Sequence, residues 1–102
     1  NTWGRRGVGE DGGVIQQEVV VRNSLGLHAR AAARFVQVAS RFRSRIGLAH
    51  EGRTADGKSI LGLLALVGSQ GARLTISADG ADEKEALRSL IELVEARFGE
   101  EP

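Results

Sequence analysis

One short segment of the chain combines side chains that can do nucleophilic chemistry at an anion-binding position. Gly26–Arg30 places the imidazole of His28 two positions before the guanidinium of Arg30. His28 stands at the start of the run 29–40, where apolar residues recur at helical spacing, so the histidine falls in the first turn of a predicted helix. Backbone N–H groups there have no intrahelical partner, and the helix dipole presents partial positive charge.

This position favours phosphoryl chemistry on His28. The positive end of a helix disfavours a cationic ring, and the lone pair of a neutral imidazole can attack phosphorus. After transfer, the same N–H groups and Arg30 can bind the new oxygens, and Gly26 lets the backbone approach closely. His28 and Arg30 are the candidate catalytic pair. On its own, however, a His-x-Arg pattern is a weak signal and is more typical of an ordinary helix end with a solvated arginine.

The elements that must position this pair can be read from hydropathy patterning. Strands are predicted over 14–22, 45–50, 53–55 and 72–78, and helices over 28–40, 60–67 and 82–98. Asp82 and Glu85 are expected to form a capping box at the third helix, and Gly99 to end it. The order βαββαβα predicts an α+β fold, an open-faced β-sandwich with a four-stranded, mainly antiparallel sheet and three helices on one face.

Length and composition indicate one domain. With 102 residues and 41% hydrophobic content, the chain can build one core. We expect a flexible arm or cloning remnant at 1–13, the domain at 14–99 and a tail at 100–102. Because the chain starts at Asn1 and contains no methionine, we expect a trimmed product or a piece of a longer protein.

Composition also excludes several classes of function. The net charge of +1 gives no reason to expect a nucleic acid or an anionic membrane as partner, and no aromatic residue lies in a predicted strand, as a sheet that stacks RNA bases requires. Cysteine is absent, and no segment is long and apolar enough to span a membrane. Because there is one candidate nucleophile, no nucleotide-binding loop and no metal-ligand spacing near His50, we expect no cofactor, no metal and no self-contained enzyme. The predicted location is the cytoplasm.

Two motifs carry a resemblance to a known family. The segment Asn23–Ala33 resembles the active-site signature of the histidine-containing phosphocarrier family, HPr, and Gly57–Gly62 resembles the family's regulatory serine segment. The resemblance covers 14–98. It implies a monomeric phosphocarrier that takes phosphate from phospho-enzyme I on His28, with help from Arg30, and passes it to an EIIA-type acceptor of the phosphoenolpyruvate-dependent phosphotransferase system.

The resemblance has one departure, at position 31. Sugar-transport members usually carry proline directly after the arginine, whereas this chain has Ala31. Alanine is an excellent helix former, so the site need not suffer. The chain resembles the nitrogen-type branch in this respect, and the transport and regulatory pathways both stay open.

The second motif and the first helix supply candidate regulatory and docking residues. Ser59 stands where an N-cap belongs, and the resemblance adds phosphorylation by an HPr kinase/phosphorylase as a second role. The run after it holds more apolar residues than one buried stripe uses, and the resemblance makes Ile60, Leu61 and Leu64 its exposed partner-binding members. Arg34 and Gln37 continue a polar stripe, with Arg30 and Arg41, that is either solvated surface or a docking face for an acidic partner.

Overall fold

The fold is described by a computed structural model over residues 14–23, 25–66 and 70–100. The arm predicted at 1–13, the end of the second helix at Val67 and Gly68, and most of the predicted tail, 101–102, lie outside the described residues. The elements are β1 (Ile15–Val20), α1 (Ala29–Ala39), β2 (Arg45–His50), β3 (Arg53–Asp56), α2 (Ile60–Ala65), β4 (Arg73–Asp79), α3 (Glu83–Glu95) and a 3-10 turn, η2 (Arg97–Gly99).

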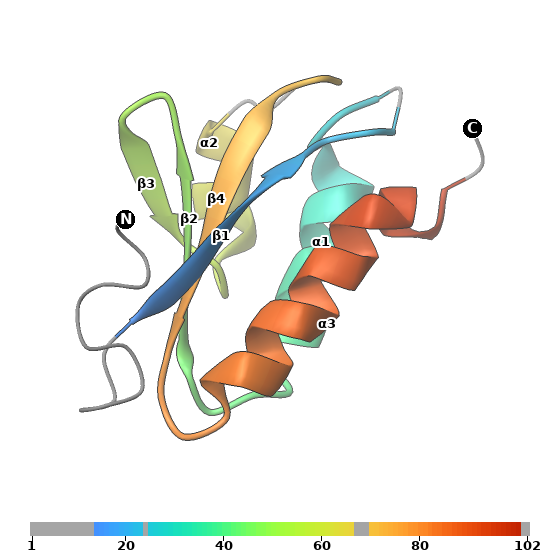
Figure 1. Ribbon diagram of the computed structural model, residues 1–102. Helices are drawn as coiled ribbons and strands as arrows, with labels where there is room; N and C mark the ends of the chain where they lie inside the picture. The colour runs from blue at the N-terminus through green and yellow to red at the C-terminus, as the bar shows by residue number, and fades with distance from the viewer. Residues whose placement is uncertain (1–13, 24, 67–69, 101–102) are drawn as a thin grey trace.

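The four strands form one sheet in the order β1-β4-β2-β3, and every neighbouring pair is antiparallel. Strands β2 and β3 are joined by the turn Glu51–Gly52, whose φ angles of 49° and 82° match the tight hairpin expected there. Helices α1 and α3 lie side by side on one face of the sheet, and α2 packs against α1 and β3 (Figure 1). The predicted α+β open-faced sandwich is confirmed.

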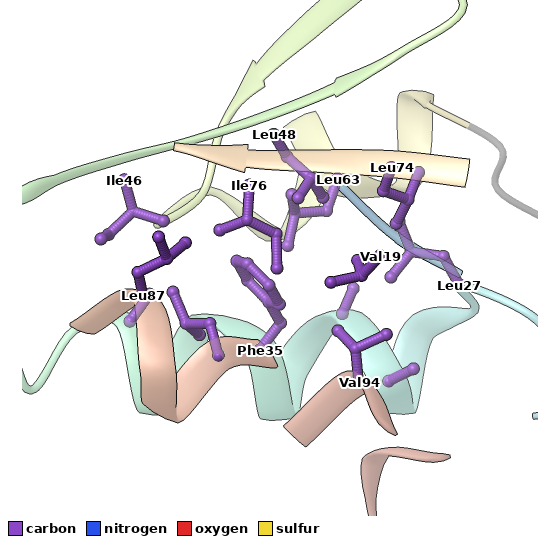
Figure 2. Close-up of a cluster of buried hydrophobic side chains, with 14 of the residues drawn as sticks. Val19, Leu27, Phe35, Ile46, Leu48, Leu63, Leu74, Ile76, Leu87 and Val94 are labelled. Carbon is purple, nitrogen blue, oxygen red and sulfur yellow. The ribbon is translucent and has the colours of Figure 1, made fainter. Parts of the chain in front are cut away.

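The core lies between the sheet and the two long helices. Leu48 and Ile76 point from the sheet toward Phe35 of α1, while Val94 closes the same cluster from α3 (Figure 2). Each of these side chains is at most 2% exposed. Because strand side chains alternate and helix side chains recur every three to four residues, each element gives one apolar face to this layer. Full burial of one such side chain contributes about 1.5–3 kcal/mol, which holds α1 rigidly against the sheet.

The start of α3 differs from the predicted capping box. Asp82 is the N-cap residue, but its side chain makes no hydrogen bond to the helix. Its carboxylate instead accepts from the backbone N–H of Arg43 at 2.9 Å, and from the N–H and hydroxyl of Ser44 at 3.0 and 2.6 Å. These donors, the Ser44 hydroxyl foremost, lower the pKa of Asp82 below its ordinary value of 3.8. The capping-box prediction was wrong because the α1–β2 loop offers more donors than the helix end.

The end of α3 turns the chain back toward the first helix. The helix ends at Glu95, earlier than the predicted end at Gly99, and Arg97, Phe98 and Gly99 follow with left-handed φ angles of 58°, 56° and 79°. Left-handed backbone costs a non-glycine residue roughly 1 kcal/mol or more. Phe98 is completely buried, and burial of about 1.5–3 kcal/mol offsets that cost. The anchored phenyl ring thereby fixes the direction in which Glu100 leaves η2.

Candidate functional site

His28 is the N-cap residue of α1. Its backbone is extended, with φ −100° and ψ −177°, and its ring atom Nδ1 accepts a hydrogen bond from the backbone N–H of Arg30 at 3.2 Å. The carbonyl of His28 accepts from the N–H of Ala32 at 2.8 Å. The imidazole therefore does what a serine or aspartate does at other N-caps, and Nδ1 faces the free N–H groups of the first turn.

The connection before α1 presents the histidine. Gly26 has a φ of 70°, a conformation that glycine adopts at little cost, and its carbonyl accepts from the N–H of His28 at 3.0 Å. The same carbonyl accepts from Nδ2 of Asn23 at 2.7 Å, and Asn23 is buried. Gly26 was expected to permit a close approach, and its structural task is to supply this left-handed turn.

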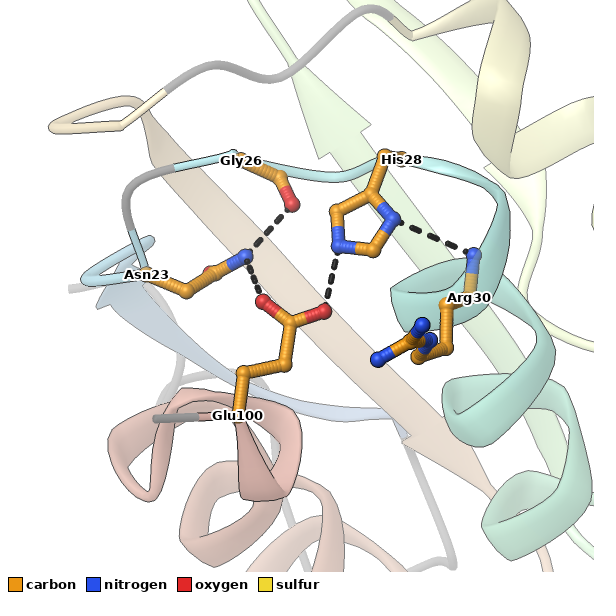
Figure 3. A network of polar contacts seen from close by, with 5 residues as sticks. All are labelled: Asn23, Gly26, His28, Arg30 and Glu100. Atoms are coloured by element: carbon orange, nitrogen blue, oxygen red, sulfur yellow. Dashed lines mark hydrogen bonds and ion pairs between the residues drawn. The ribbon is translucent and has the colours of Figure 1, made fainter. Parts of the chain in front are cut away.

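Glu100 joins the site from the far end of the chain. Its Oε2 contacts Nε2 of His28, and its Oε1 accepts from Nδ2 of Asn23 at 3.0 Å (Figure 3). The side chains of His28 and Glu100 are 26% and 12% exposed. Sequence analysis placed Glu100 in a tail, because nothing local connects it to a histidine 72 positions earlier. Phe98, which the sequence pattern places in the third helix, instead lies after it in η2 and anchors this segment in the core.

These contacts assign one tautomer to the neutral ring of His28. A carboxylate only accepts hydrogen bonds, so Nε2 beside Glu100 carries the proton. A backbone N–H only donates, so Nδ1 beside Arg30 carries the lone pair. The nucleophilic nitrogen thus lies at the positive end of α1.

Arg30 and Arg34 bring positive charge to the same end of the molecule. Both are exposed. The guanidinium of Arg30 points toward the side of the ring on which Glu100 lies (Figure 3). Arg34 lies against Gly99, because a Cβ built there would come within 2.6 Å of its Nη1. Because the backbone N–H of Arg30 donates to Nδ1, the Arg30 side chain belongs to a residue that is already next to a group bound at that nitrogen.

The short helix α2 carries the second motif. Ser59 is its N-cap, and the hydroxyl accepts from the N–H of Gly62 at 3.0 Å. Ile60 and Leu61 are 40% and 80% exposed. Leu64, expected to be exposed with them, is half-buried and packs against the core. Of the three predicted apolar docking residues, Ile60 and Leu61 are therefore exposed at the surface.

Three further observations concern the helices and the segments beside them. Leu25, in the connection that leads to His28, is 71% exposed and adds an apolar side chain that sequence analysis did not single out. Gln37 is exposed on the same helix as Arg34, as the polar stripe predicts. Lys58 donates from Nζ to the carbonyl of Phe42 at 2.8 Å and so ties the segment before α2 to the loop between α1 and β2.

The second histidine, His50, belongs to the sheet. His50 lies on β2, where its Nδ1 contacts the carbonyl oxygen of Arg73 at 3.1 Å. Within 14–23, 25–66 and 70–100, no group of three or more His, Cys, Asp or Glu side chains could hold a metal ion. Across the same ranges, no helix is both long enough and apolar enough to cross a membrane.

The open-faced sandwich is the fold of known phosphocarrier proteins. The family model for the "PTS HPr component phosphorylation site" matches residues 15–96. The phosphocarrier protein HPr of Xylella fastidiosa is 44% identical over 88 residues, which cover 86% of this chain and 99% of that protein. The chain belongs to the HPr family, the phosphocarrier proteins of the phosphotransferase system.

Solved structures give the same result. The crystal structure of HPr-C-His from Thermoanaerobacter tengcongensis is similar, with a TM-score of 0.82, 44% identity and coverage of 85% of this chain and 98% of that one. The Bacillus subtilis catabolite repression protein Crh has a TM-score of 0.67 and 46% identity, with 81% of this chain and 95% of that one covered. Its crystal structure is described as a dimer with a swapped domain.

Proposed function

We propose that this chain accepts a phosphoryl group from phospho-enzyme I on Nδ1 of His28 and passes it to an EIIA-type acceptor. The observation that carries the proposal is the orientation of the ring. Nδ1 accepts from the N–H of Arg30 at the positive end of α1, while Nε2 is held by Glu100. A phosphoryl group on Nδ1 would meet unpaired N–H groups and Arg30, which suit its negative charge.

The transfer step needs little movement. The lone pair on Nδ1 forms the bond to phosphorus as the bond between phosphorus and the donor breaks, and that electron pair stays on the donor. The Arg30 N–H that bound the lone pair then donates to a phosphoryl oxygen. Arg30's exposed guanidinium adds a charge-assisted hydrogen bond.

The docking surface proposed for enzyme I and the acceptor combines apolar and basic side chains. Exposed Ile60 and Leu61 on α2 supply apolar contact area, and Arg34 and Gln37 on α1 supply polar contacts to an acidic partner surface. Helix α2 packs against α1, the helix that His28 caps. One partner can therefore cover both elements while it reaches the ring.

The direct test is labelling. With phosphoenolpyruvate and enzyme I, the chain should gain one acid-labile phosphoryl group, and His28→Ala should abolish the gain. His50→Ala is the matched control, because it removes the other histidine from a strand on the sheet and should label like the parent. Equal labelling of His28→Ala and the parent would refute the proposal.

A second candidate function is regulation of other proteins instead of transport. Ala31, which is completely buried in the first turn of α1, stands where sugar-transport members usually carry proline, and a relative bears the name catabolite repression protein. Phosphorylation of Ser59 by an HPr kinase/phosphorylase would belong to this role. Incubation with such a kinase should label the parent on Ser59 and leave Ser59→Ala unlabelled, and an unlabelled parent would remove this route.

We further propose that the domain acts in the cytoplasm as a monomer spanning the predicted 14–99 together with Glu100. Light scattering in solution should give the mass of one chain, and the mass of two would place this protein with the dimeric relative instead.

A further inference from the structure

We propose that Glu100 is a positioning residue for phosphoryl transfer on His28, whose carboxylate holds the proton on Nε2 and balances the positive charge that the ring acquires when Nδ1 is phosphorylated. This inference rests on the proposed function. It assigns a role to a residue outside both motifs that carry the family resemblance.

Glu100 is held in place from its backbone and from its side chain. Its backbone N–H donates to the carbonyl of Arg97 at 2.9 Å, and the buried ring of Phe98 anchors the turn before it. One carboxylate oxygen accepts from Asn23 at 3.0 Å, which leaves the other for His28 (Figure 3). Asn23 is fixed in turn by its hydrogen bond to the carbonyl of Gly26, so the donor that holds the Glu100 carboxylate is itself held in place.

The surroundings make this contact stronger than an ordinary surface ion pair. Nη1 of Arg73 and Oε1 of Glu18 are 3.5 Å apart, and their side chains are 72% and 55% exposed. Ion pairs that are this exposed contribute little to the stability of the fold, because water screens them. The Glu100 side chain is only 12% exposed, and Asn23 beside it is 1% exposed. A charge with so little water around it acts on its neighbour through a lower effective dielectric constant.

The charge balance of the transfer explains what the carboxylate does. The neutral ring starts with its proton on Nε2 and donates the Nδ1 lone pair to phosphorus. No proton leaves, so the ring becomes a phosphorylated cation, and the adjacent carboxylate stabilises it. When the group moves on to the acceptor, the electron pair of the breaking bond returns to Nδ1 and the ring is neutral again with Nε2 still protonated. Glu100 thus keeps the same tautomer ready through both halves of the cycle.

The test uses Glu100→Gln in the full chain, with Glu95→Gln as the matched control. Glutamine keeps the shape and an acceptor oxygen but loses the charge, and Glu95 is an exposed residue at the end of α3. Single-turnover transfer from phospho-enzyme I should be at least about five-fold slower for Glu100→Gln, because the cation loses its counter-charge. Glu95→Gln should transfer like the parent, and all three proteins should melt at similar temperatures.

A second measurement reports on the ring itself. At about pH 8, where imidazoles are generally neutral, the parent should show a downfield Nε2 proton resonance that exchanges slowly with water. In Glu100→Gln this resonance should move upfield and exchange faster, while Glu95→Gln leaves it unchanged.

The outcomes separate the two proposals. If the parent accepts phosphate and Glu100→Gln transfers as fast as Glu95→Gln, the role of Glu100 is refuted and the phosphocarrier function stands. Slow transfer with an unchanged Nε2 resonance also refutes it, because Glu100 would then act on the partner instead of the ring. If the parent takes no phosphate at all, the proposed function fails, and a resonance that Glu100→Gln does not move would remove the positioning role as well.

Discussion

Substitutions at Ser59 can test two roles separately. Its hydroxyl caps α2, which affects stability, and its position next to the proposed docking residues affects partner binding. The hydroxyl accepts from the N–H of Gly62 at 3.0 Å, and among the residues that the structure describes no other side chain caps the start of α2. Ser59→Ala should lower the free energy of unfolding by about 1 kcal/mol, which corresponds to a melting temperature about 4–8 °C lower for a domain of this size.

Ser59→Asp should behave differently in the same melt. Aspartate keeps an acceptor for the Gly62 N–H and suits the positive end of the helix. Its larger group can fit because position 62 has no Cβ; one placed there would lie 3.2 Å from the Ser59 hydroxyl. The melting temperature should therefore match the parent or exceed it slightly.

The affinity of Ser59→Asp for enzyme I should be lower than that of the parent, although the melting temperature is kept or raised. The added charge precedes the exposed Ile60 and Leu61 and would meet the acidic surface that Arg34 and its stripe suggest for the partner. Two like charges about 8 Å apart at an effective dielectric constant of about 40 repel by roughly 1 kcal/mol, or about five-fold in Kd. The loss should shrink between ionic strengths of about 0.05 M and 0.5 M as screening increases.

Calorimetric titration at the two ionic strengths is the assay, with Ser59→Ala as the uncharged control. That variant should bind within about two-fold of the parent, because it adds no charge. If Ser59→Asp binds as tightly as the parent at low salt, either α2 does not dock or the partner is not acidic there. If Ser59→Asp melts as low as Ser59→Ala, the capping argument itself is refuted.

Three further substitutions test other parts of the site. Arg30→Ala should slow phosphoryl transfer about ten-fold or more with little change in melting temperature, and equal rates would remove Arg30 from the site. Leu61→Ser should weaken partner binding and leave the melting temperature unchanged, since the side chain is 80% exposed; unchanged affinity would exclude Leu61 from the interface. Asp82 has a lowered pKa, so its contribution to stability is present above the ordinary value of 3.8 and is lost as the pH falls through the folded-state value. Asp82→Asn should melt below the parent near neutral pH and approach it below pH 3.8, and a constant gap at all pH values would contradict this account.

Much of the fold could be predicted because it depends on local patterns. Alternation placed Ile46 and Leu48 inward on β2, and both are buried. The apolar periodicity of α1 and the Ser59 cap of α2 were likewise visible in a few consecutive residues. These features arise from short-range geometry, so a single sequence is enough to find them.

The features of the structure that could not be predicted are contacts between residues that lie far apart in the sequence. Asp82 has the residue type of a helix cap, yet its carboxylate bonds to Arg43 and Ser44, about 40 positions earlier, where three donors converge. Glu100 was assigned to a tail, yet it contacts His28 and Asn23. The partners of both carboxylates are set by the tertiary packing of distant segments. A local sequence pattern does not indicate contacts of this kind.

The contact between His28 and Glu100, 72 positions apart, ties chemical competence to completion of the tertiary structure. A chain in which the segment after α3 has not docked would present the histidine and Arg30 without a carboxylate on Nε2. Such a species should be a poorer phosphoryl acceptor, because its ring is free to rotate and to change tautomer. If the roles proposed for enzyme I and Glu100 hold, phosphorylation favours fully folded molecules, and its rate reports whether the segment anchored by Phe98 has docked.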